Sequence, residues 1–391
     1  MKKILSIVAV LLAIGLAVAG FLNDEPTTNE QAEQIRQRIE SSISLYPVYE
    51  RMNDAERDAY VALCAGFENF QTSDIKLIST DSQSDCNALK KSLQNIYREI
   101  VYEQSEYFWV NPYELKITTR TVGGKYQLLV EPTYILSKEE TMEKRDAFQT
   151  RIDRIVSQAN SKGTTYEKIL FVHDYILENV VYDHALVEAG DYNKTGINAY
   201  GCLMGGKTIC SGYTQAFTTI MRRLGIECGA EFSSYGMFSI FEGHVWNYCK
   251  LDGEYYYFDL TWDDIDPDSE LAEYMDYYHC YFGLTKDEMT KARTYLDPDA
   301  PTPDCLGTKH NYFIHNNWNF ATYNLEEVAP VIREQKESGC VQLRFDSYAE
   351  LLRAQSDLLT DGKIWDLLDG IDNLKYVVSK SNLQLYILLV K

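Results

Sequence analysis

The stretch Gly-Gly-Lys-Thr-Ile-Cys-Ser-Gly-Tyr at residues 205–213 places a cysteine directly after a glycine turn. Apolar residues then recur at the spacing of one helical face. They are Tyr213, Phe217, Ile220, Met221 and Leu224. Gly225 follows the last of them and is a typical helix stop. The pattern therefore predicts a helix with Cys210 at or near its N-terminus.

A cysteine at that position is chemically favoured as a nucleophile. The unpaired N–H groups and the positive dipole end of a helix stabilise a thiolate, and they can also donate to an oxyanion on an attacked carbonyl. A buried structural cysteine is the alternative interpretation, and the helix start alone does not decide between the two. The decision depends on whether a base lies within reach of Cys210.

Residues 243–262 contain the second informative pattern, a hairpin. Two runs rich in aromatic and β-branched residues flank Asp252-Gly253, which is a strong two-residue turn signal. With this turn, His244 would face Thr261. Opposed residues share a sheet face, so His244 and Asp259 would be diagonal neighbours, roughly 7 Å apart at Cα.

In the same register Trp246 would face Asp259, one position along from the histidine. A thiol nucleophile needs an imidazole to take its proton and a carboxylate to orient that imidazole. We therefore predict Cys210 as nucleophile, His244 as base and Asp259 as orienting carboxylate. Without a cysteine upstream, His244 and Asp259 would read as an ordinary cross-strand pair.

Three other polar residues near these motifs are assigned to structural roles. Asp263 and Asp264 are rival carboxylates, but they lie past the paired stretch and are expected to cap the end of the hairpin or its loop. His173 lies on the apolar stripe of a helix expected over residues 166–180, with Thr164 or Thr165 as its cap. We interpret His173 as a hydrogen-bonded packing residue outside the site.

Residues 168–264 resemble the core of the transglutaminase-like superfamily, in its bacterial exported branch. The resemblance is carried in order by five motifs: Tyr182-Asp183, residues 199–203, residues 209–213, residues 244–247 and residues 251–263. It implies that the family's nucleophile, base and carboxylate fall on Cys210, His244 and Asp259. It also implies an α+β fold with a papain-like core, in which a helix carrying the cysteine packs on an antiparallel sheet carrying the histidine and the aspartate.

The chain divides into four expected parts. Residues 1–22 combine Lys2 and Lys3 with an apolar run ending near Ala17-Val18-Ala19, as in a signal peptide, although the run approaches the length of a membrane anchor. Residues 23–155 are expected to form an N-terminal α/β module, with a hairpin turning at residues 122–124. Residues 156–300 form the catalytic domain. Residues 301–391, after a proline cluster at 298, 301 and 303, form a small C-terminal α/β module.

The net charge and the cysteine content indicate which binding partners, disulfides and cofactors to expect. A formal net charge of −21 argues against nucleic acid and against anionic membrane surfaces. Nine cysteines in an exported protein are consistent with four disulfides and one free thiol. No cysteine and histidine spacing resembles a zinc site, so neither a metal nor another cofactor is expected. Any membrane contact would come through an uncleaved N-terminal segment.

These observations predict a secreted or cell-surface thiol enzyme that acts on amide bonds of a peptide or protein, with cell-wall peptide as one candidate substrate. A thioester resolved by water makes a cysteine protease-like hydrolase, which we favour. A thioester resolved by an amine makes a cross-linking transglutaminase, and a deamidating enzyme is a further member of the class. The alternatives from other classes are a non-enzymatic cell-surface binding module and a disulfide-stabilised scaffold with Cys210 in a bridge.

Overall fold

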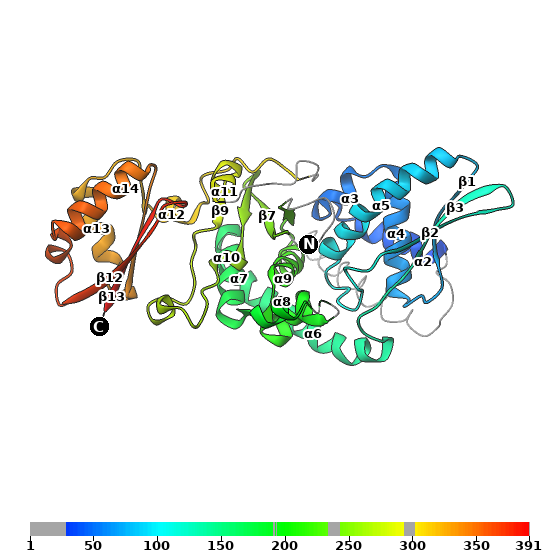
Figure 1. Ribbon diagram of the computed structural model, residues 1–391, viewed down its shortest axis with the longest axis horizontal. Helices are drawn as coiled ribbons and strands as arrows, with labels where there is room; N and C mark the ends of the chain where they lie inside the picture. Colours follow the sequence, from blue (N-terminus) through cyan, green and yellow to red (C-terminus); the bar gives the residue numbers. More distant parts are fainter. Residues whose placement is uncertain (1–28, 191, 193, 234–242, 293–301, 391) are drawn as a thin grey trace, which may run out of the picture. The chain divides into compact units, whose positions relative to one another are not determined.

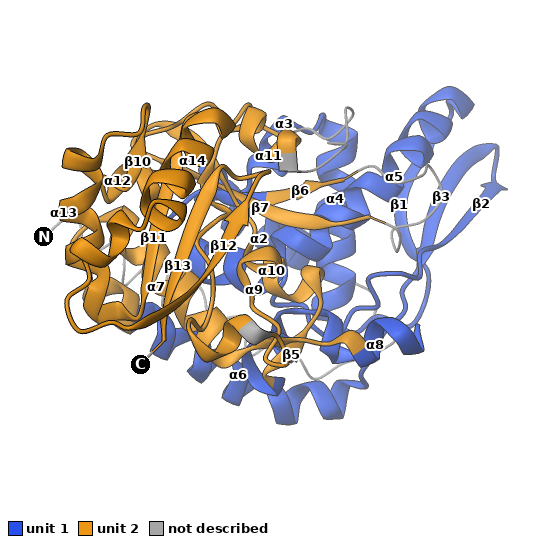
Figure 2. Ribbon diagram, turned by 60° about the vertical axis from the view of Figure 1, so that its left-hand side comes forward, with its two compact units in different colours: residues 1–157, 185–205, 215–229 blue, residues 158–184, 206–214, 230–391 orange. Residues whose placement is uncertain are grey.

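The structure is a computed structural model that describes residues 29–190, 192, 194–233, 243–292 and 302–390. The expected signal peptide or anchor at residues 1–22 and the prolines at 298 and 301 lie outside these residues. Within the described ranges, no helix has both the length and the apolar character needed to cross a membrane. The described chain forms two compact units, shown in Figure 2.

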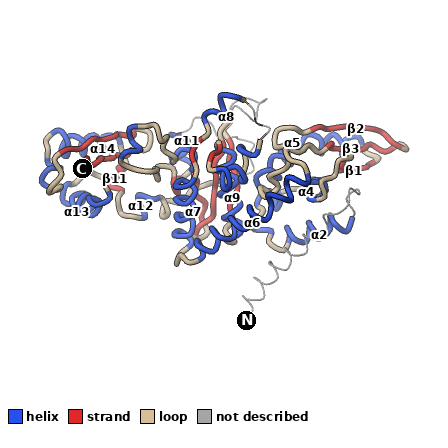
Figure 3. The backbone as a smooth tube through the Cα atoms, turned by 90° about the horizontal axis from the view of Figure 1, so that it is seen from below, coloured by secondary structure: helices blue, strands red, loops and turns tan. Residues whose placement is uncertain are grey.

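The first unit comprises residues 1–157, 185–205 and 215–229. Its three-stranded sheet has the order β1-β3-β2, with both pairs antiparallel. Helices α4 (Asp54–Glu68) and α5 (Gln83–Glu103) contact this sheet, as Figure 3 shows. The strands are β1 (Ile75–Thr80), β2 (Lys116–Val122) and β3 (Lys125–Glu131), and further helices are α2 (Asn29–Glu40), α3 (Pro47–Arg51), α6 (Lys138–Asn160) and α8 (His184–Ala189). The hairpin expected at residues 122–124 is present, because Gly123 and Gly124 supply its positive φ angles.

The second unit comprises residues 158–184, 206–214 and 230–391 and contains a four-stranded sheet of order β6-β7-β8-β9. The strands are β6 (Cys228–Phe232), β7 (Val245–Leu251), β8 (Glu254–Phe258) and β9 (Phe282–Leu284). The β7–β8 hairpin turns at Asp252 and Gly253, both with positive φ, and Leu251 pairs with Glu254 as the sequence predicts. The antiparallel register holds as far as Asn247 and Phe258.

Beyond that pair, the expected register is wrong. Asp259 is the N-cap of the short helix α10 (Leu260–Asp263), so the chain leaves the sheet there. Thr261 therefore lies in a helix and does not face His244 across a ladder. The aspartate that was expected on a strand instead starts a helical turn, a capping preference that aspartate has in general.

Two helices of the core follow their sequence signals closely. Helix α7 (Thr165–Asn179) begins with a capping box, in which Thr164 and Glu167 satisfy each other's backbone N–H groups. Helix α9 (Cys210–Arg223) begins at the cysteine and stops before Gly225, whose φ is +74°. The N-terminal half of α9 lies beside β7 (Figure 1), since the Thr214 hydroxyl donates to the carbonyl oxygen of Val245 at 3.2 Å.

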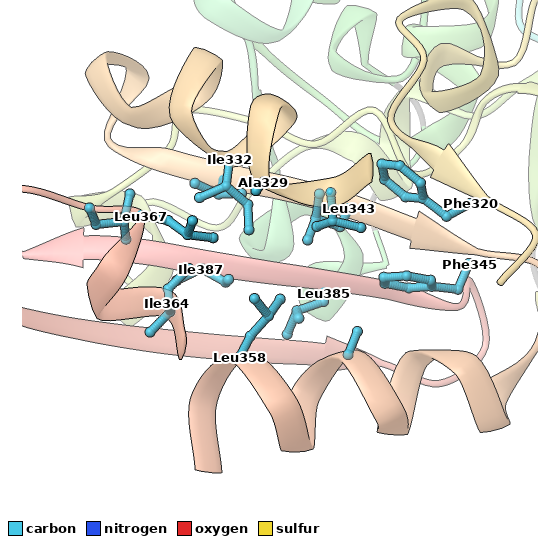
Figure 4. Close-up of a cluster of buried hydrophobic side chains, with 14 of the residues drawn as sticks. Phe320, Ala329, Ile332, Leu343, Phe345, Leu358, Ile364, Leu367, Leu385 and Ile387 are labelled. Carbon is cyan, nitrogen blue, oxygen red and sulfur yellow. The ribbon is translucent and has the colours of Figure 1, made fainter. Parts of the chain in front are cut away.

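A mixed sheet of order β10-β11-β13-β12 closes the chain. Its strands are β10 (Asn319–Phe320), β11 (Cys340–Phe345), β12 (Asn373–Ser379) and β13 (Gln384–Val390), accompanied by α11 (Lys286–Ala292), α12 (Tyr312–His315), α13 (Leu325–Gln335) and α14 (Tyr348–Gln355). Leu385 and Ile387 of β13 join a cluster with Leu343 of β11 and Ile332 of α13 (Figure 4).

The alternate residues of β13 face another cluster. Tyr386 and Leu388 pack with Trp246, Tyr248 and Tyr257 of the β6-β7-β8-β9 sheet. Because side chains alternate along a strand, β13 contributes to two cores at once. The C-terminal sheet is thereby built into the second unit, and the whole chain is of the α+β class.

All nine cysteines are free thiols, so the expectation of four disulfides is wrong. Eight of them are buried, and Cys210 is half-buried. A buried thiol packs as a small apolar side chain, and a count of cysteines cannot distinguish such residues from bridge partners.

Candidate active site

Cys210 is the first residue of α9, and the chain before it is held by a short parallel pairing. Strand β5 (Lys207–Thr208) pairs with β4 (Val181–Tyr182). The N–H of Asp183 donates to the carbonyl oxygen of Thr208 at 2.8 Å, and the N–H of Val181 donates to that of Gly206 at 3.0 Å. These hydrogen bonds fix the backbone just before Cys210 and so position its thiol at the start of α9.

His244 lies immediately before β7, and its backbone is fastened to Ser233. Its N–H donates to the Ser233 hydroxyl at 2.7 Å, and its carbonyl oxygen accepts from the Ser233 N–H at 2.8 Å. The ring nitrogen Nε2 lies 2.7 Å from Oδ2 of Asp259. Hydrogen bonds at the backbone of His244 and a contact at its ring nitrogen Nε2 thus fix the position of the imidazole.

Asp259 is fully buried, and its two carboxylate oxygens have different partners. Oδ2 binds His244, whereas Oδ1 accepts from the N–H of Trp262 at 3.3 Å and caps α10. The backbone N–H of Asp259 donates to the carbonyl oxygen of Tyr281 at 3.1 Å. A carboxylate held in this way presents one oxygen to the imidazole in a fixed direction.

The electrostatics of His244 favour its protonated form. Burial by itself lowers the pKa of this imidazole, but the charge and hydrogen bond of Asp259, followed by the hydrogen bond and charge of Cys210, raise its pKa to about 9. The structure therefore brings together all three residues selected from the sequence. Since Nε2 faces Asp259, Nδ1 is the ring nitrogen left to face the thiol.

The other polar residues near the motifs have partners of their own. The pKa of Asp263 and that of Asp264 are each raised to about 6, chiefly by burial. Asp263 accepts from the N–H of Tyr281 at 3.0 Å, and Asp264 accepts from the Tyr213 hydroxyl at 2.6 Å. Asn247, a polar residue close to His244 in sequence, is buried and donates to the carbonyl oxygen of Thr214 at 3.1 Å.

Within the described part of the chain, one group of side chains has metal-ligand chemistry. His173, Asp174 and His279 each offer a donor atom, and these atoms lie within 4.8 Å of one another. Oδ1 of Asp174 lies 2.9 Å from Nδ1 of His173 and 2.9 Å from Nε2 of His279. Hydrogen bonds among the three side chains account for the arrangement without an ion.

Sequence reasoning missed one surface residue next to the site. The Trp262 side chain is 49% exposed, and its ring centroid lies 6.2 Å from that of His244 and 6.2 Å from that of Tyr281. A large exposed aromatic ring beside a base is a typical contact for an approaching ligand. Its position in the sequence, three residues after Asp259, was the available signal.

One family model matches the part of the chain that contains Cys210, His244 and Asp259. Residues 152–260 match the transglutaminase-like superfamily. No curated protein matches the chain. Similar solved structures include a TGase, at 12% identity over 41% of this chain and 49% of the other with a TM-score of 0.26. A proposed cysteine protease from Cytophaga hutchinsonii is 15% identical over 39% and 63%, with a TM-score of 0.24.

A third similar structure is a proposed protease from Parabacteroides distasonis, at 13% identity over 37% of this chain and 36% of the other, with a TM-score of 0.21. The chain thus spans less than two thirds of each of these three proteins.

Proposed function

Because residues 152–260 match the transglutaminase-like superfamily, we propose that this protein is a thiol enzyme that hydrolyses amide bonds of peptides or proteins through a thioester. Cys210 is the nucleophile, His244 the general acid and base, and Asp259 the carboxylate that orients the imidazole. Export to the cell surface and a cell-wall peptide as substrate belong to the same proposal.

The reaction follows from the positions of the three side chains. The Cys210 thiolate attacks the amide carbonyl carbon, and N–H groups at the start of α9 can donate to the resulting oxyanion. The C–N bond then breaks while the His244 imidazolium gives its proton to the leaving amine. Water attacks the thioester, His244 takes a proton from it, and the C–S bond breaks to release the carboxylic acid and restore the thiolate.

The observation that carries the proposal is the 2.7 Å contact between His244 Nε2 and the fully buried carboxylate of Asp259, with Cys210 as the other partner of the same imidazole. A surface cross-strand pair would leave both groups in solvent. Here the carboxylate is buried, and it stabilises the imidazolium that the chemistry requires.

The first experiment measures the rate of Cys210 alkylation by iodoacetamide against pH in the wild type and in His244→Ala. A thiolate–imidazolium pair predicts fast labelling well below the pKa of a free thiol, near 8.5, and the loss of that labelling in the variant. Slow labelling that is indifferent to His244 would favour the non-enzymatic binding module.

The second experiment decides how the thioester is resolved. A peptide library is incubated with the full chain, with and without a primary amine acceptor, and the products are identified by mass spectrometry. Hydrolysis predicts new carboxyl termini in both conditions and none with Cys210→Ser. Products joined to the amine at glutamine side chains would assign cross-linking activity instead, and a gain of about one mass unit at glutamine would assign deamidation.

A further inference from the structure

Helix α10 links the catalytic carboxylate to a second buried aspartate. Asp259 caps the start of this single turn, and Asp263 is its last residue. The N–H of Asp263 donates to the carbonyl oxygen of Asp259 at 3.2 Å. The backbone of Asp263 is therefore bonded to the residue whose carboxylate contacts His244.

Asp263 is anchored at both of its oxygens. Oδ1 accepts from the N–H of Tyr281 at 3.0 Å, and Oδ2 lies 3.1 Å from Nε2 of His173 on α7. The side chains of Asp263 and His173 are both fully buried. The contact between Asp263 and His173 thus connects α7 to α10, the turn that Asp259 caps.

The partners of His173 require its ring to be a cation. Nε2 faces a carboxylate oxygen of Asp263, and Nδ1 lies 2.9 Å from Oδ1 of Asp174. Ionised carboxylates only accept hydrogen bonds, so both ring nitrogens must donate, and only imidazolium has two donors. The other rings around it are that of His279, stacked at 5.1 Å between ring centroids, and those of Tyr277 and Phe282, each in a T-shaped arrangement.

The charges agree with this assignment. Burial lowers the pKa of His173, but its bonds to Asp174 and Asp263 raise it to about 9. His279 remains the uncharged neighbour, because burial lowers its pKa. The negative charge of Asp259 is among the influences that raise the pKa of Asp263. A buried cation next to Asp263 offsets this repulsion between the two aspartates, whereas a buried carboxylate left unpaired is strongly destabilising.

We propose that His173 is a positioning residue of the active site: its imidazolium, held between Asp174 and Asp263, fixes the turn that aims Asp259 at His244. The proposal rests on the proposed function, and it adds Asp263, His173 and Asp174 to the three residues of the site, so that five of these residues form a connected chain. That chain runs through His244, Asp259, Asp263, His173 and Asp174.

The test compares the alkylation of Cys210 by iodoacetamide against pH in the full chain and four variants. His173→Gln keeps a donor but removes the charge, and Asp263→Asn keeps an acceptor for the N–H of Tyr281. Their double variant forms a neutral pair. Glu231→Gln is the matched control, because Glu231 is an equally buried carboxylate, bound to the Tyr257 hydroxyl at 2.9 Å, with a raised pKa and no bond to α10 among the contacts described.

We expect His173→Gln to raise the apparent pKa of alkylation by about one unit, which is about a tenfold loss of rate at pH 6. Asp263→Asn alone should lose about threefold, since it leaves no unpaired carboxylate. The double variant should recover from the His173→Gln level toward that of Asp263→Asn, because the two residues act through one contact. Glu231→Gln should keep the wild-type profile.

Two results would overturn the proposal. One is a profile within twofold of the wild type in both single variants, and the other is a double variant that is labelled no faster than His173→Gln alone. If His173→Gln does not fold, Asp263→Asn decides by the same criterion against Glu231→Gln. If the wild type is labelled fast and the variants are labelled at the same rate, only this proposal is wrong. If the wild type is labelled slowly, the proposed function is wrong, and this proposal fails with it.

Discussion

In the proposed mechanism, the side chain of Asp259 serves both the chemistry and the fold. One oxygen orients His244, and the other caps the helical turn that follows. Both bonds come from a group without solvent exposure, so its charge acts in a medium of low effective dielectric constant. The direction in which the carboxylate faces the imidazole is therefore set in part by its bond to the backbone of α10.

At the residue scale, Trp262 is expected to select substrates. Trp262→Ala should leave the alkylation of Cys210 by iodoacetamide unchanged but should slow labelling by N-benzyl iodoacetamide about three- to tenfold, because an aromatic contact is worth about 0.5–1.5 kcal/mol. The ratio of the two rate constants is the measurement.

The matched control for that prediction is Trp365→Ala. Trp365 is 44% exposed and lies in the short helix Lys363–Asp366 of the C-terminal part. Its removal should leave the ratio at the wild-type value. A ratio that changes equally in both variants would mean that Trp262 does not contact the probe.

At the scale of the element, the start of α9 is built by local backbone geometry. The glycine turn at residues 205–206 directly precedes β5, which pairs in parallel with β4, and the next residues open the helix with Cys210. Gly206 has a φ of +68°, and a Cβ there would lie 3.3 Å from the carbonyl oxygen of Asn179. Gly205 has open space around it.

Gly206→Ala should therefore destabilise the protein by roughly 1–2 kcal/mol, the cost of placing a side chain in the left-handed region. Gly205→Ala, one position earlier, should stay within about 0.5 kcal/mol of the wild type, as is usual away from such features. Urea unfolding followed by tryptophan fluorescence measures both. Equal losses in the two variants would contradict the role given to the positive φ of Gly206.

At the scale of the whole molecule, the nine free thiols predict how many cysteines a thiol-specific reagent will label. A thiol-specific reagent should label one cysteine rapidly in the folded protein, Cys210, since the other eight are buried. In guanidinium chloride without reductant it should label nine. A count of one in the unfolded, unreduced protein would restore the expectation of four disulfides.

The stability of the whole chain should also fall as the pH rises through the range in which two histidines titrate. The folded state raises the pKa of His173 and of His244 from 6.5 to about 9, in each case against the effect of burial and through bonded carboxylates. A raised histidine pKa stabilises the folded state fully below about pH 6.5, and that contribution is lost as pH rises through about 9. Burial raises the pKa of the Cys280 and Cys305 thiols, and this further decreases the stability of the folded state above pH 9.

We expect the Tm to decrease between pH 6.5 and 9.5 and the decrease to be smaller in His244→Gln. His184→Gln, which replaces a mostly exposed histidine, is the control and should keep the wild-type slope. Differential scanning fluorimetry across this range provides the measurement. A Tm independent of pH from 6.5 to 9.5 would contradict the charged state assigned to both buried histidines.

Local signals in the sequence were sufficient for the elements that carry the proposed triad. A glycine turn, a 3.6-residue apolar period and a following glycine predicted α9 and its start at Cys210. An Asp-Gly turn predicted the hairpin that places His244 and Asp259 at adjacent strand ends, and the structure forms it in the predicted register as far as Phe258. Such signals act between neighbours in the chain, so they can be read without the fold.

Only the tertiary structure decided what lies around those elements. It turned Asp259 into a helix cap, paired Asp263 with His173, which lies 90 positions earlier in the sequence, and buried eight cysteines as free thiols. None of these outcomes leaves a local pattern. Burial and long-range bonding depend on which surfaces meet when the chain packs, and there the requirement to satisfy each buried polar group outweighs the preference of any single residue.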